Sequence, residues 1–578
     1  MNKLFFLLFL FLTKAGLAQL VYVDDAIGND GNNGTSLATP WKTIQYAMDN
    51  AAPGNTVLIR TGTYYEALQV NVSGTAGNAI TFKNYNNENV YIDGNNTAIT
   101  LLYIADQSNL VIQGLVFQNT LGNNSAGVVI EGNCATIVFK KNKIRNINWT
   151  ASAAKIPSST NNSNPFLVYG NNASNAINNI VIDSNEVSNN ITGFSESLTL
   201  DGNINGFSIT NNSVHDNLNI GILCAGNYLV SSNPATDNAR NGSVKNNVVY
   251  NCVSNYATSG GIYIDGGKTI IVEKNKVYGN GYGIEIGAEE LGTTSAITVR
   301  DNLIFDNTIA GLAIGGYNFP STGQVIDCII ENNTFVKNDN TNSGNGEIVI
   351  SKASNCIFRN NILYTNTQNI PLSSSYDLLQ SNLFNYNAYY APSGVAANLS
   401  FVFNNTTYSG LAAFQSSVAQ EANGIFVDPL LTNTILTAPS TVDFSLSTGS
   451  LCIDAGNPLH MIVSNEVDYY NFNRIANSII DIGAIEYGST PTSTMNSLAN
   501  NPMLTVYPNP FTETVSLKYS ALFLPTKLAV YNELGIEVFV KNKDFNVEEL
   551  NLTQLPKGLY LLKIYTETDF YSYKIVKQ

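Results

Sequence analysis

The chain has 578 residues, of which 44% are hydrophobic and only 12% are charged, and it contains 44 glycines. These proportions exclude a disordered, coiled-coil or helix-rich protein, and the length requires several domains or one long repeat array. The net charge of −15 argues against nucleic acid or an anionic membrane as a partner, because both require a basic surface. We therefore expect a mostly β protein.

Residues 1–18 have the organisation of a secretory signal peptide. A lysine lies at position 3, an apolar run follows over residues 4–12, and small residues precede Gln19, which is the pattern of a cleaved export signal. No later stretch is apolar enough for a membrane span. We therefore expect a secreted protein without a transmembrane segment.

The segment from Tyr22 to about Phe117 resembles the start of pectate-lyase-like β-helix proteins. The resemblance rests on Val21-Tyr-Val-Asp-Asp25, Pro40-Trp-Lys-Thr-Ile44, Pro53-Gly-Asn-Thr-Val57 and Gly62-Thr-Tyr64. It extends over about the first 480 residues and implies a right-handed parallel β-helix, without specifying a reaction. It also implies a short amphipathic helix, roughly Ile44 to Ala52, that covers the open end of the core and prevents edge-to-edge pairing.

A short pattern recurs between about residues 140 and 366: an apolar strand, an asparagine, a short apolar stretch and a second asparagine. The first asparagines are Asn142, Asn212, Asn247, Asn275, Asn302, Asn333 and Asn361, and the second are Asn146, Asn217, Asn251, Asn280, Asn307, Asn338 and Asn366. From Asn212 onward the period is 35, 28, 27, 31 and 28 residues, which indicates a solenoid of parallel strands. Buried asparagines at a turn can be satisfied only by one another or by backbone, so they are expected to form a hydrogen-bonded ladder.

A second strand of five residues follows each ladder segment. The copies begin at Gly127, Ser197, Gly221, Gly261, Gly283, Gly311 and Glu347. Their second and fourth residues are almost all Ile, Val or Leu and should point inward, which predicts that the first, third and fifth residues lie on the outer face.

Acidic residues gather on that predicted outer face. Asp201, Ala225 and Asp265 share the fifth position, so the two aspartates should lie about two rungs, roughly 9 to 10 Å, apart. Glu285 lies one rung further on and two residues offset, roughly 8 Å from Asp265 by the same geometry. A solvated acidic face is the plain interpretation, but an acidic column in one register is less expected in a chain with so few charges.

Three aspartate-bearing segments follow the repeats and resemble the part that closes many extracellular bacterial β-helix proteins. They are Phe426-Val-Asp-Pro429, Cys452-Ile-Asp-Ala-Gly456 and Asp481-Ile-Gly-Ala-Ile-Glu486. Their aspartates are expected to form turns and accept backbone hydrogen bonds.

The end of the chain closely resembles the C-terminal sorting domain of the type IX secretion system. The resemblance rests on Val506-Tyr-Pro-Asn-Pro-Phe511, the strand Lys527-Leu-Ala-Val-Tyr531 and Lys557-Gly-Leu-Tyr560. It implies export by the type IX machinery of a Bacteroidetes-type bacterium, followed by release or surface attachment. The predicted domains are a signal peptide (1–18), a right-handed parallel β-helix (19–488), a linker (489–504) and a small β-sandwich sorting domain (505–578).

The six cysteines are too few for a disulfide scaffold and have no C-x-x-C spacing for zinc. Cys328 and Cys356 each precede a repeat asparagine by five residues. They are either buried free thiols or neighbours close enough to bond in an oxidising compartment.

Ligands of parallel β-helices usually lie along an outer sheet, so the acidic face is the candidate site. A polysaccharide lyase would bind calcium through the acids while a base removes the proton beside the uronate carboxylate. A glycosidase would instead use Asp265 and Glu285 as an acid/base pair at a spacing that suits inversion. The candidate calcium ligands are Asp201, Asp265, Glu285 and Glu289, and the candidate bases are Lys268, Arg240 and Lys245.

Two loops, 147–165 and 227–241, flank this face and are of the kind that build binding sites. The candidate substrate contacts are Tyr263, Tyr282, Tyr317 and Arg240, with Trp149 as a further stacking surface. His215 takes the repeat position of Tyr250, Tyr278 and Phe305, which favours an aromatic stack over an acid/base role like that in some uronan epimerases.

The sequence supports a secreted polysaccharide-active protein, with a lyase acting on an acidic glycan ahead of the alternatives. A non-enzymatic adhesin or glycan-binding solenoid is the second hypothesis, because the asparagine-rich surface carries no decisive motif. A glycoside hydrolase or a uronan epimerase is the third. The arginine motif of the main pectate lyases and the Gly-His-Gly motif of polygalacturonases are both absent.

Overall fold

The computed structural model describes residues 19–97, 100–316, 318, 321–374, 381–460, 466–477, 479–489, 504–519, 527–532, 537–542, 549–565 and 570–578. The expected signal peptide, Tyr317 and almost all of the expected linker lie outside these residues. The chain forms two compact units, of which the first ends at Gly488 and the second contains the C-terminal strands.

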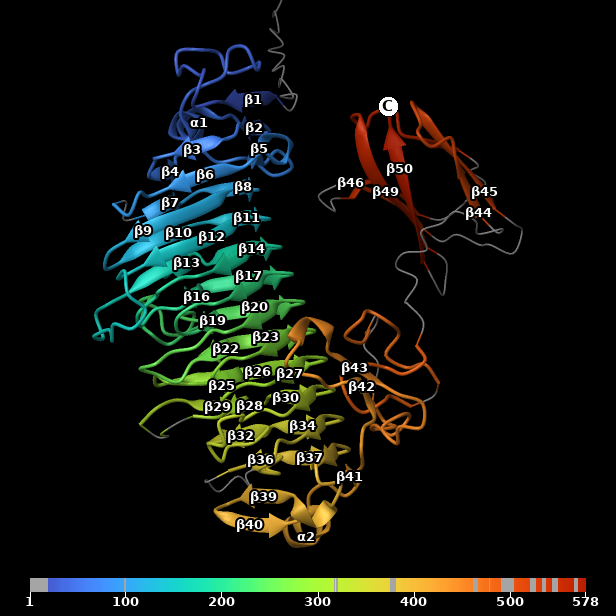
Figure 1. The fold of residues 1–578 in the computed structure, drawn as a ribbon. Helices are drawn as coiled ribbons and strands as arrows, with labels where there is room; N and C mark the ends of the chain where they lie inside the picture. Colours follow the sequence, from blue (N-terminus) through green and yellow to red (C-terminus); the bar gives the residue numbers. More distant parts are fainter. Residues whose placement is uncertain are drawn as a thin grey trace, which may run out of the picture. The chain divides into compact units, whose positions relative to one another are not determined.

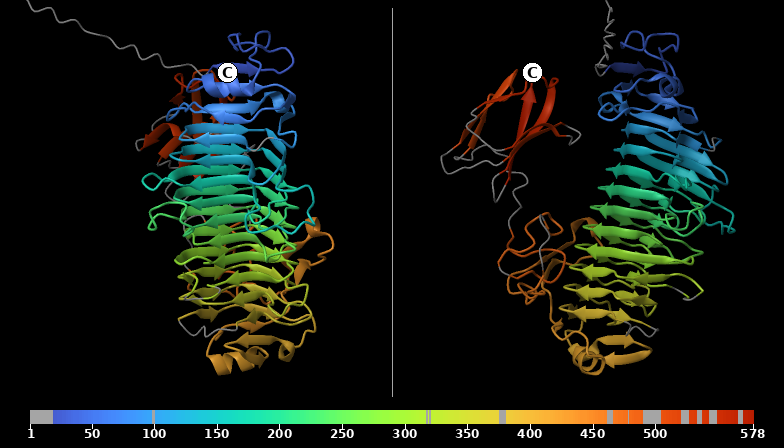
Figure 2. Two further views of the ribbon diagram at one scale, coloured as in Figure 1. Left: turned by 90° about the vertical axis from the view of Figure 1, so that its left-hand side faces the viewer. Right: turned by 180° about the vertical axis from the view of Figure 1, so that it is seen from behind.

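The first unit is a parallel β-helix in which most coils add one strand to each of three sheets (Figure 1). In the described residues the sheets, which we call A, B and C, contain 15, 13 and 13 strands. The regular stacking of the coils is visible in both views of Figure 2. The predicted solenoid of parallel strands is confirmed.

The strands of sheet A are β1 (Leu20–Val23), β2 (Thr56–Ile59), β5 (Ile80–Asn84), β8 (Ser108–Gln113), β11 (Ala135–Lys140), β14 (Ile177–Asp183), β17 (Ile204–Thr210), β20 (Ala239–Lys245), β23 (Lys268–Glu273), β26 (Thr293–Arg300), β29 (Gln324–Ile326), β30 (Ile329–Glu331), β33 (Ala353–Ser354), β34 (Ile357–Arg359) and β37 (Leu383–Asn385). The strands of sheet B are β3 (Gly62–Tyr64), β6 (Val90–Asp93), β9 (Val116–Leu121), β12 (Lys143–Asn148), β15 (Glu186–Ser188), β18 (Ser213–His215), β21 (Val248–Tyr250), β24 (Lys276–Tyr278), β27 (Leu303–Phe305), β31 (Thr334–Val336), β35 (Ile362–Tyr364), β38 (Ala388–Tyr390) and β41 (Ile425–Phe426). The strands of sheet C are β4 (Leu68–Val70), β7 (Thr100–Ala105), β10 (Ser125–Glu131), β13 (Ser163–Gly170), β16 (Leu198–Gly202), β19 (Ile222–Ala225), β22 (Gly260–Asp265), β25 (Tyr282–Gly287), β28 (Ala310–Ile314), β32 (Ile348–Ile350), β36 (Leu372–Ser373), β39 (Ser400–Phe403) and β40 (Thr406–Ser409).

The predicted asparagine ladder runs between sheets A and B. Side-chain amides bond from one coil to the next at 2.6–3.3 Å through Asn142, Asn185, Asn212, Asn247, Asn275, Asn302, Asn333, Asn361 and Asn387 and end on the carboxylate of Glu421. Asn185 and Asn387 extend the set that the sequence pattern identified. Burial raises the pKa of Glu421 to about 7, so the ladder ends on a carboxyl group that is easily protonated.

A second ladder lies five residues further along each coil. The prediction was wrong for three asparagines, Asn146, Asn251 and Asn366, which do not belong to this ladder. In this ladder the side-chain amide of Asn190 donates to that of Asn217. In later coils Asn280 donates to Asn307, Asn307 donates to Asn338, and Asn338 donates to the carboxylate of Glu347. The slots expected for Asn146 and Asn251 are instead taken by Ile147 and Cys252, whose backbone N–H groups bond to the ladder. The spacing in those two coils is four residues, so the asparagine falls one position short and turns outward with φ near +55°. Asn366 bonds to backbone carbonyl groups, because Glu347 already ends the ladder.

The two ends of the β-helix are covered by short helices. The predicted N-terminal helix is α1 (Ile44–Asn50), whose Ile44, Ala47 and Met48 enter the continuous core. At the other end α2 (Leu411–Val418) places Phe414 against Phe401 and Phe403 of β39.

The segment after β41 packs along the outer side of sheet B instead of across the open end. It contains β42 (Leu431–Asn433) and β43 (Asp443–Leu446). The Gly483 N–H donates to Asn360 O at 2.8 Å, and the Ala484 N–H donates to Thr334 Oγ1 at 3.0 Å. Asp481 accepts backbone hydrogen bonds from Asp454 and Tyr487, as expected for its aspartates. The helix α2 already covers the core, which leaves this segment free to cover a sheet.

The second unit is a small antiparallel sandwich with its own core. One sheet contains β44 (Leu504–Tyr507), β45 (Thr514–Tyr519) and β48 (Glu549–Asn551). The other contains β46 (Lys527–Asn532), β47 (Glu537–Asn542), β49 (Gly558–Tyr565) and β50 (Phe570–Lys577). No helix in the described part of the chain has the length and apolar character needed to cross a membrane.

Candidate functional site on the outer face of sheet C

The predicted register of the acidic face is correct. Leu200 lies opposite Cys224, so the next residues, Asp201 and Ala225, are in the same register position. Ala225 in turn lies opposite Asp265, and the two aspartates therefore share one column. Glu285 lies opposite Tyr263 on the next rung. The column also contains Glu131 and Tyr169 on the two rungs before Asp201.

The first position of each copy does not lie on the outer face, contrary to the prediction. A Cβ on Gly261 would come within 2.7 Å of the Asn280 amide nitrogen, and one on Gly283 within 2.6 Å of Ile304. The first residue therefore turns into the corner beside the second ladder, and it is glycine or serine in every copy except the last. Glu347 occupies this column and satisfies its buried carboxylate by ending the ladder.

Asp265 is buried instead of solvated, because a loop folds over it. Its side chain is 1% exposed. The Tyr228 hydroxyl donates to one carboxylate oxygen, and the Glu289 N–H donates to the other at 2.9 Å. Asp237 shapes this loop by accepting the N–H groups of Leu229 and Ser231, each at 2.7 Å.

Tyr263 and Glu285 fit beside each other because two neighbouring residues are glycine. A Cβ on Gly287 would lie 2.5 Å from the Tyr263 hydroxyl oxygen, and one on Gly260 would lie 3.4 Å from Glu285 Oε2. The Tyr263 ring therefore lies over Gly287, and its hydroxyl donates to Glu289 at 3.0 Å. Tyr282, at the start of β25, lies opposite Gly260, and burial followed by the charge of Glu285 raises its pKa to about 12.

The carboxyl groups of this face have raised pKa values. Burial, followed by the charge of Asp237, raises the pKa of Asp201 to about 7, and burial raises that of Asp265 to about 7. Burial, followed by the negative charges of Glu289 and Asp265, holds the pKa of Glu285 well above its usual range. The charges that contribute to these increases are other carboxylates, so the face holds protons near neutral pH.

Sequence reasoning missed two members of the site, Glu196 and Tyr228. Burial and the charge of Asp201 raise the pKa of Glu196 to about 8. Glu196 lies just before the residues that define the repeat strand, and Tyr228 lies inside an irregular loop. Neither position has a periodic signal, although the loop around Tyr228 was expected to border the site.

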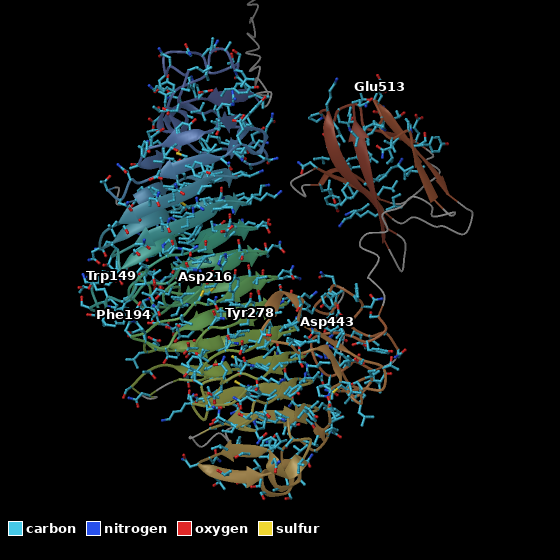
Figure 3. All side chains as sticks on the ribbon, viewed as in Figure 1. Trp149, Phe194, Asp216, Tyr278, Asp443 and Glu513 are labelled. Carbon is cyan, nitrogen blue, oxygen red and sulfur yellow. The ribbon has the colours of Figure 1, made fainter. Side chains whose placement is uncertain are left out.

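Aromatic side chains border the entry into β16. Phe194 is 40% exposed, and its ring packs on Tyr256 with a centroid separation of 5.2 Å. Trp149 is nearly buried beside Gly193 and lies at the same edge of the β-helix as Phe194 (Figure 3). These loops border one side of sheet C, and the loop that carries Tyr228 borders the other.

The predicted bases lie on sheet A, around the corner from the acids. Lys268 begins β23 opposite Arg240 of β20. The Arg240 guanidinium donates to Asn203 Oδ1 and to the carbonyl oxygens of Thr236 and Asn238, so it holds the loop in place. Lys245 forms an ion pair of 2.8 Å with Glu273.

His215 lies on sheet B, and the predicted aromatic stack is confirmed. The rings of His215, Tyr250, Tyr278 and Phe305 stack at centroid separations of 4.7, 4.9 and 5.0 Å. The His215 imidazole also contacts the Asp216 carboxylate at 2.8 Å. Tyr317, the remaining predicted contact, lies outside the described residues.

The expected calcium ligands do not converge as a set. Both carboxylate oxygens of Asp265 are occupied by Tyr228 and by the Glu289 backbone. Within the described residues, no group of three or more His, Cys, Asp or Glu side chains is arranged to hold a metal ion. The donor set therefore does not fit a preformed calcium site.

A relative of almost the same length as the β-helix region shows the family. The chain is 32% identical over 459 residues to the uncharacterized protein YwoF of Bacillus subtilis (strain 168), a match that covers 76% of this chain and 93% of that protein. The chain belongs to the YwoF family. Residues 238–342 of this YwoF-family protein also match the family model described as a right handed beta helix region.

The C-terminal unit matches a second family model. Residues 505–578 match the model described as a secretion system C-terminal sorting domain, with the boundaries that the sequence predicted. This member of the YwoF family therefore combines a right-handed β-helix region with a type IX sorting domain. The domain implies secretion or attachment to the cell surface.

Three further similarities are more limited. This YwoF-family chain is 39% identical over 85 residues to pectate lyase PEL9 of Emericella nidulans, covering 14% of this chain and 20% of that enzyme. Its structure is similar to that of pectate lyase Pel9A, with a TM-score of 0.39, 15% identity and coverage of 82% of this chain and 97% of that chain. A rhamnogalacturonan lyase structure gives a TM-score of 0.40 at 16% identity, covering 59% of this chain and 87% of that chain.

Proposed function

We propose that this protein binds an acidic, uronate-containing polysaccharide across the outer face of sheet C and cleaves it by β-elimination. The observation that carries the proposal is the set of carboxyl groups with raised pKa values on neighbouring rungs, bordered by aromatic loops on one side. A parallel sheet presents equally spaced rungs of about 4.8 Å, which suits an extended polymer. The local identity to pectate lyase PEL9 supports elimination as the reaction class.

A neutral carboxyl group can bind a uronate without a metal ion. The pKa of Glu285 lies well above its usual range and that of Asp201 is about 7, so both retain protons close to neutral pH. A protonated carboxyl group donates a short, strong hydrogen bond to a carboxylate. Such a bond withdraws charge from the uronate and makes the adjacent C–H proton more acidic.

Elimination also needs a base and a leaving group. Lys268 is the predicted base; it begins β23 of sheet A, three residues after Asp265, so in this proposal the substrate extends to the corner between sheets C and A. The base takes the proton beside the uronate carboxyl, and the electron pair of that C–H bond forms the new double bond. The adjacent bond from carbon to the glycosidic oxygen breaks, and the leaving oxygen takes up a proton, for which a protonated carboxyl group of the face is the proposed donor. In these proposed steps the protonated carboxyl groups of the face take the place of a metal ion.

Hydrolysis by two carboxyl groups is the second candidate. It is favoured by one observation: the charged groups that shift the pKa values of Asp201 and Glu285 are carboxylates, with no lysine or arginine among them. A protonated Glu285 would then act as the general acid, and an ionised neighbour would activate water.

Incubation of the secreted protein with polyuronates and neutral glycans, with and without calcium, distinguishes these functions. Elimination gives absorbance at about 235 nm, from unsaturated products, whereas hydrolysis gives only reducing ends. We expect absorbance on a polyuronate, reduced at least about 100-fold by Glu285→Gln and unchanged by Asp49→Asn, an exposed acid on α1. Reducing ends without absorbance would establish hydrolysis. Binding without any product would establish a glycan-binding solenoid and overturn the enzymatic proposal.

A further inference from the structure

Cys328 and Cys356 occupy the same position on successive coils. Cys328 directly precedes β30 and Cys356 directly precedes β34, and these strands pair in register with Ile329 opposite Ile357. The Ile357 N–H donates to the Cys328 carbonyl oxygen at 2.9 Å. Both side chains point into the core, with exposures of 1% and 0%.

The two thiols also have the same surroundings. Each Sγ lies 3.3 Å from the carbonyl oxygen two residues earlier, that of Ile326 for Cys328 and that of Ser354 for Cys356. The two cysteines are buried free thiols in the structure, one on each of two adjacent coils. Neighbouring rungs are about 4.8 Å apart, which lies within the Cα separation of about 4.4 to 6.8 Å that disulfides span.

The other four cysteines are placed differently, although all six are described and buried. Cys224 lies between Leu200 and Ile264 on the neighbouring rungs. Cys252 lies between Asn217 and Asn280 in the second ladder. Cys134 precedes β11, and Cys452 lies in the segment after β43. Only Cys328 and Cys356 are rung neighbours of each other.

We propose that Cys328 and Cys356 form a disulfide bond in the exported protein. The sorting domain implies that the chain is secreted or attached to the cell surface, and exported proteins encounter an oxidising environment in which disulfides persist. The bond joins two adjacent coils near the C-terminal end of the β-helix and closes a loop that contains β30, β31, β32 and β33.

The oxidant is a thiol oxidoreductase that carries a disulfide. One cysteine thiolate attacks that disulfide and forms a mixed disulfide with the oxidoreductase. The second cysteine thiolate then attacks the mixed disulfide, so the Cys328–Cys356 bond forms and the oxidoreductase leaves as a dithiol with the two electrons and two protons. Because both thiols are buried in the finished coil, the exchange takes place before the coil closes.

Counting free thiols in the intact secreted chain tests the proposal directly. The protein is purified without reductant, unfolded in guanidinium chloride with iodoacetamide, and its mass measured. We expect four alkylated cysteines of the six, six after prior reduction, and a linked peptide pair containing Cys328 and Cys356. Six alkylated cysteines without reduction, or a link between any other pair, would overturn the proposal. Loss of the sorting domain does not alter the count, because the last cysteine is Cys452.

Two variants provide a matched comparison. Cys328→Ser leaves five cysteines that should all be alkylated without reduction, whereas Cys224→Ser should show three of five, because its pair remains intact. Adding reductant should lower the thermal midpoint of the wild type and of Cys224→Ser by about 3 to 4 °C, and should not change that of Cys328→Ser. An equal response of all three proteins would contradict the bond.

Discussion

Removing one ladder amide tests whether the asparagine ladder stabilises the β-helix. Asn275 Oδ1 accepts the Asn247 N–H at 2.9 Å and the Asn247 amide at 3.0 Å. Asn275 Nδ2 donates to Val244 O at 2.9 Å and to Asn302 Oδ1 at 3.0 Å. Replacing Asn275 with alanine removes four hydrogen bonds.

The size of the effect follows from the groups left without partners. They are the Asn247 N–H, one Asn247 amide hydrogen and the Val244 carbonyl oxygen. Each buried polar group without a partner costs about 1 to 3 kcal/mol, so the expected loss in the free energy of unfolding is about 3 to 9 kcal/mol. Water that enters the vacated space should bring the loss toward the lower part of this range.

Equilibrium unfolding in urea, followed by tryptophan fluorescence, measures this loss. Trp41 and Trp149 are the only two tryptophans, so the signal reports on the β-helix and not on the sorting domain. The control is Asn205→Ala, an exposed asparagine that should change the free energy by less than about 0.5 kcal/mol. A loss for Asn275→Ala below about 1 kcal/mol would refute the structural role of the ladder.

Three further predictions follow from buried or stacked groups. Burial raises the pKa of Glu347 to about 8 and that of Glu421 to about 7, above the unfolded value of about 4.3. The contribution of these two groups to stability should therefore decline as the pH rises from about 4.3 through 7 to 8. Replacing both residues with glutamine should lessen the fall in thermal midpoint between pH 5 and pH 9. His215→Ala should leave cleavage within about twofold of wild type, because the ring belongs to a stack on sheet B; a loss of 100-fold or more in kcat would restore its acid/base role. Arg474 and Asp301 form an ion pair of 3.6 Å, and their side chains are 0% and 2% exposed. Arg474→Met leaves the Asp301 carboxylate buried without its partner, so it should lower the free energy of unfolding in urea by about 3 to 5 kcal/mol. A loss below about 1 kcal/mol would show that the pair contributes little.

Much of the fold could be predicted because a solenoid repeats its local rules. The asparagine spacing gave the coil period, and the alternation of apolar residues placed Asp201, Asp265 and Glu285 in the correct register. The aromatic stack of His215 and the N-terminal helix followed from the same local patterns. In each case the physical cause lies within one coil or its immediate neighbour, so a short stretch of sequence contains it.

The candidate site depended on contacts between distant segments, which no local pattern records. Tyr228 reaches Asp265 across 37 positions, which turns an expected solvated aspartate into a buried one with a raised pKa. The inward turn of the first glycine in each strand, and the packing of the segment after β41 along sheet B, likewise depend on which space neighbouring coils leave open. The residues alone therefore determined the coil, its register and the order of the acids, whereas burial and hence protonation were set by tertiary folding, because desolvation depends on what covers a group.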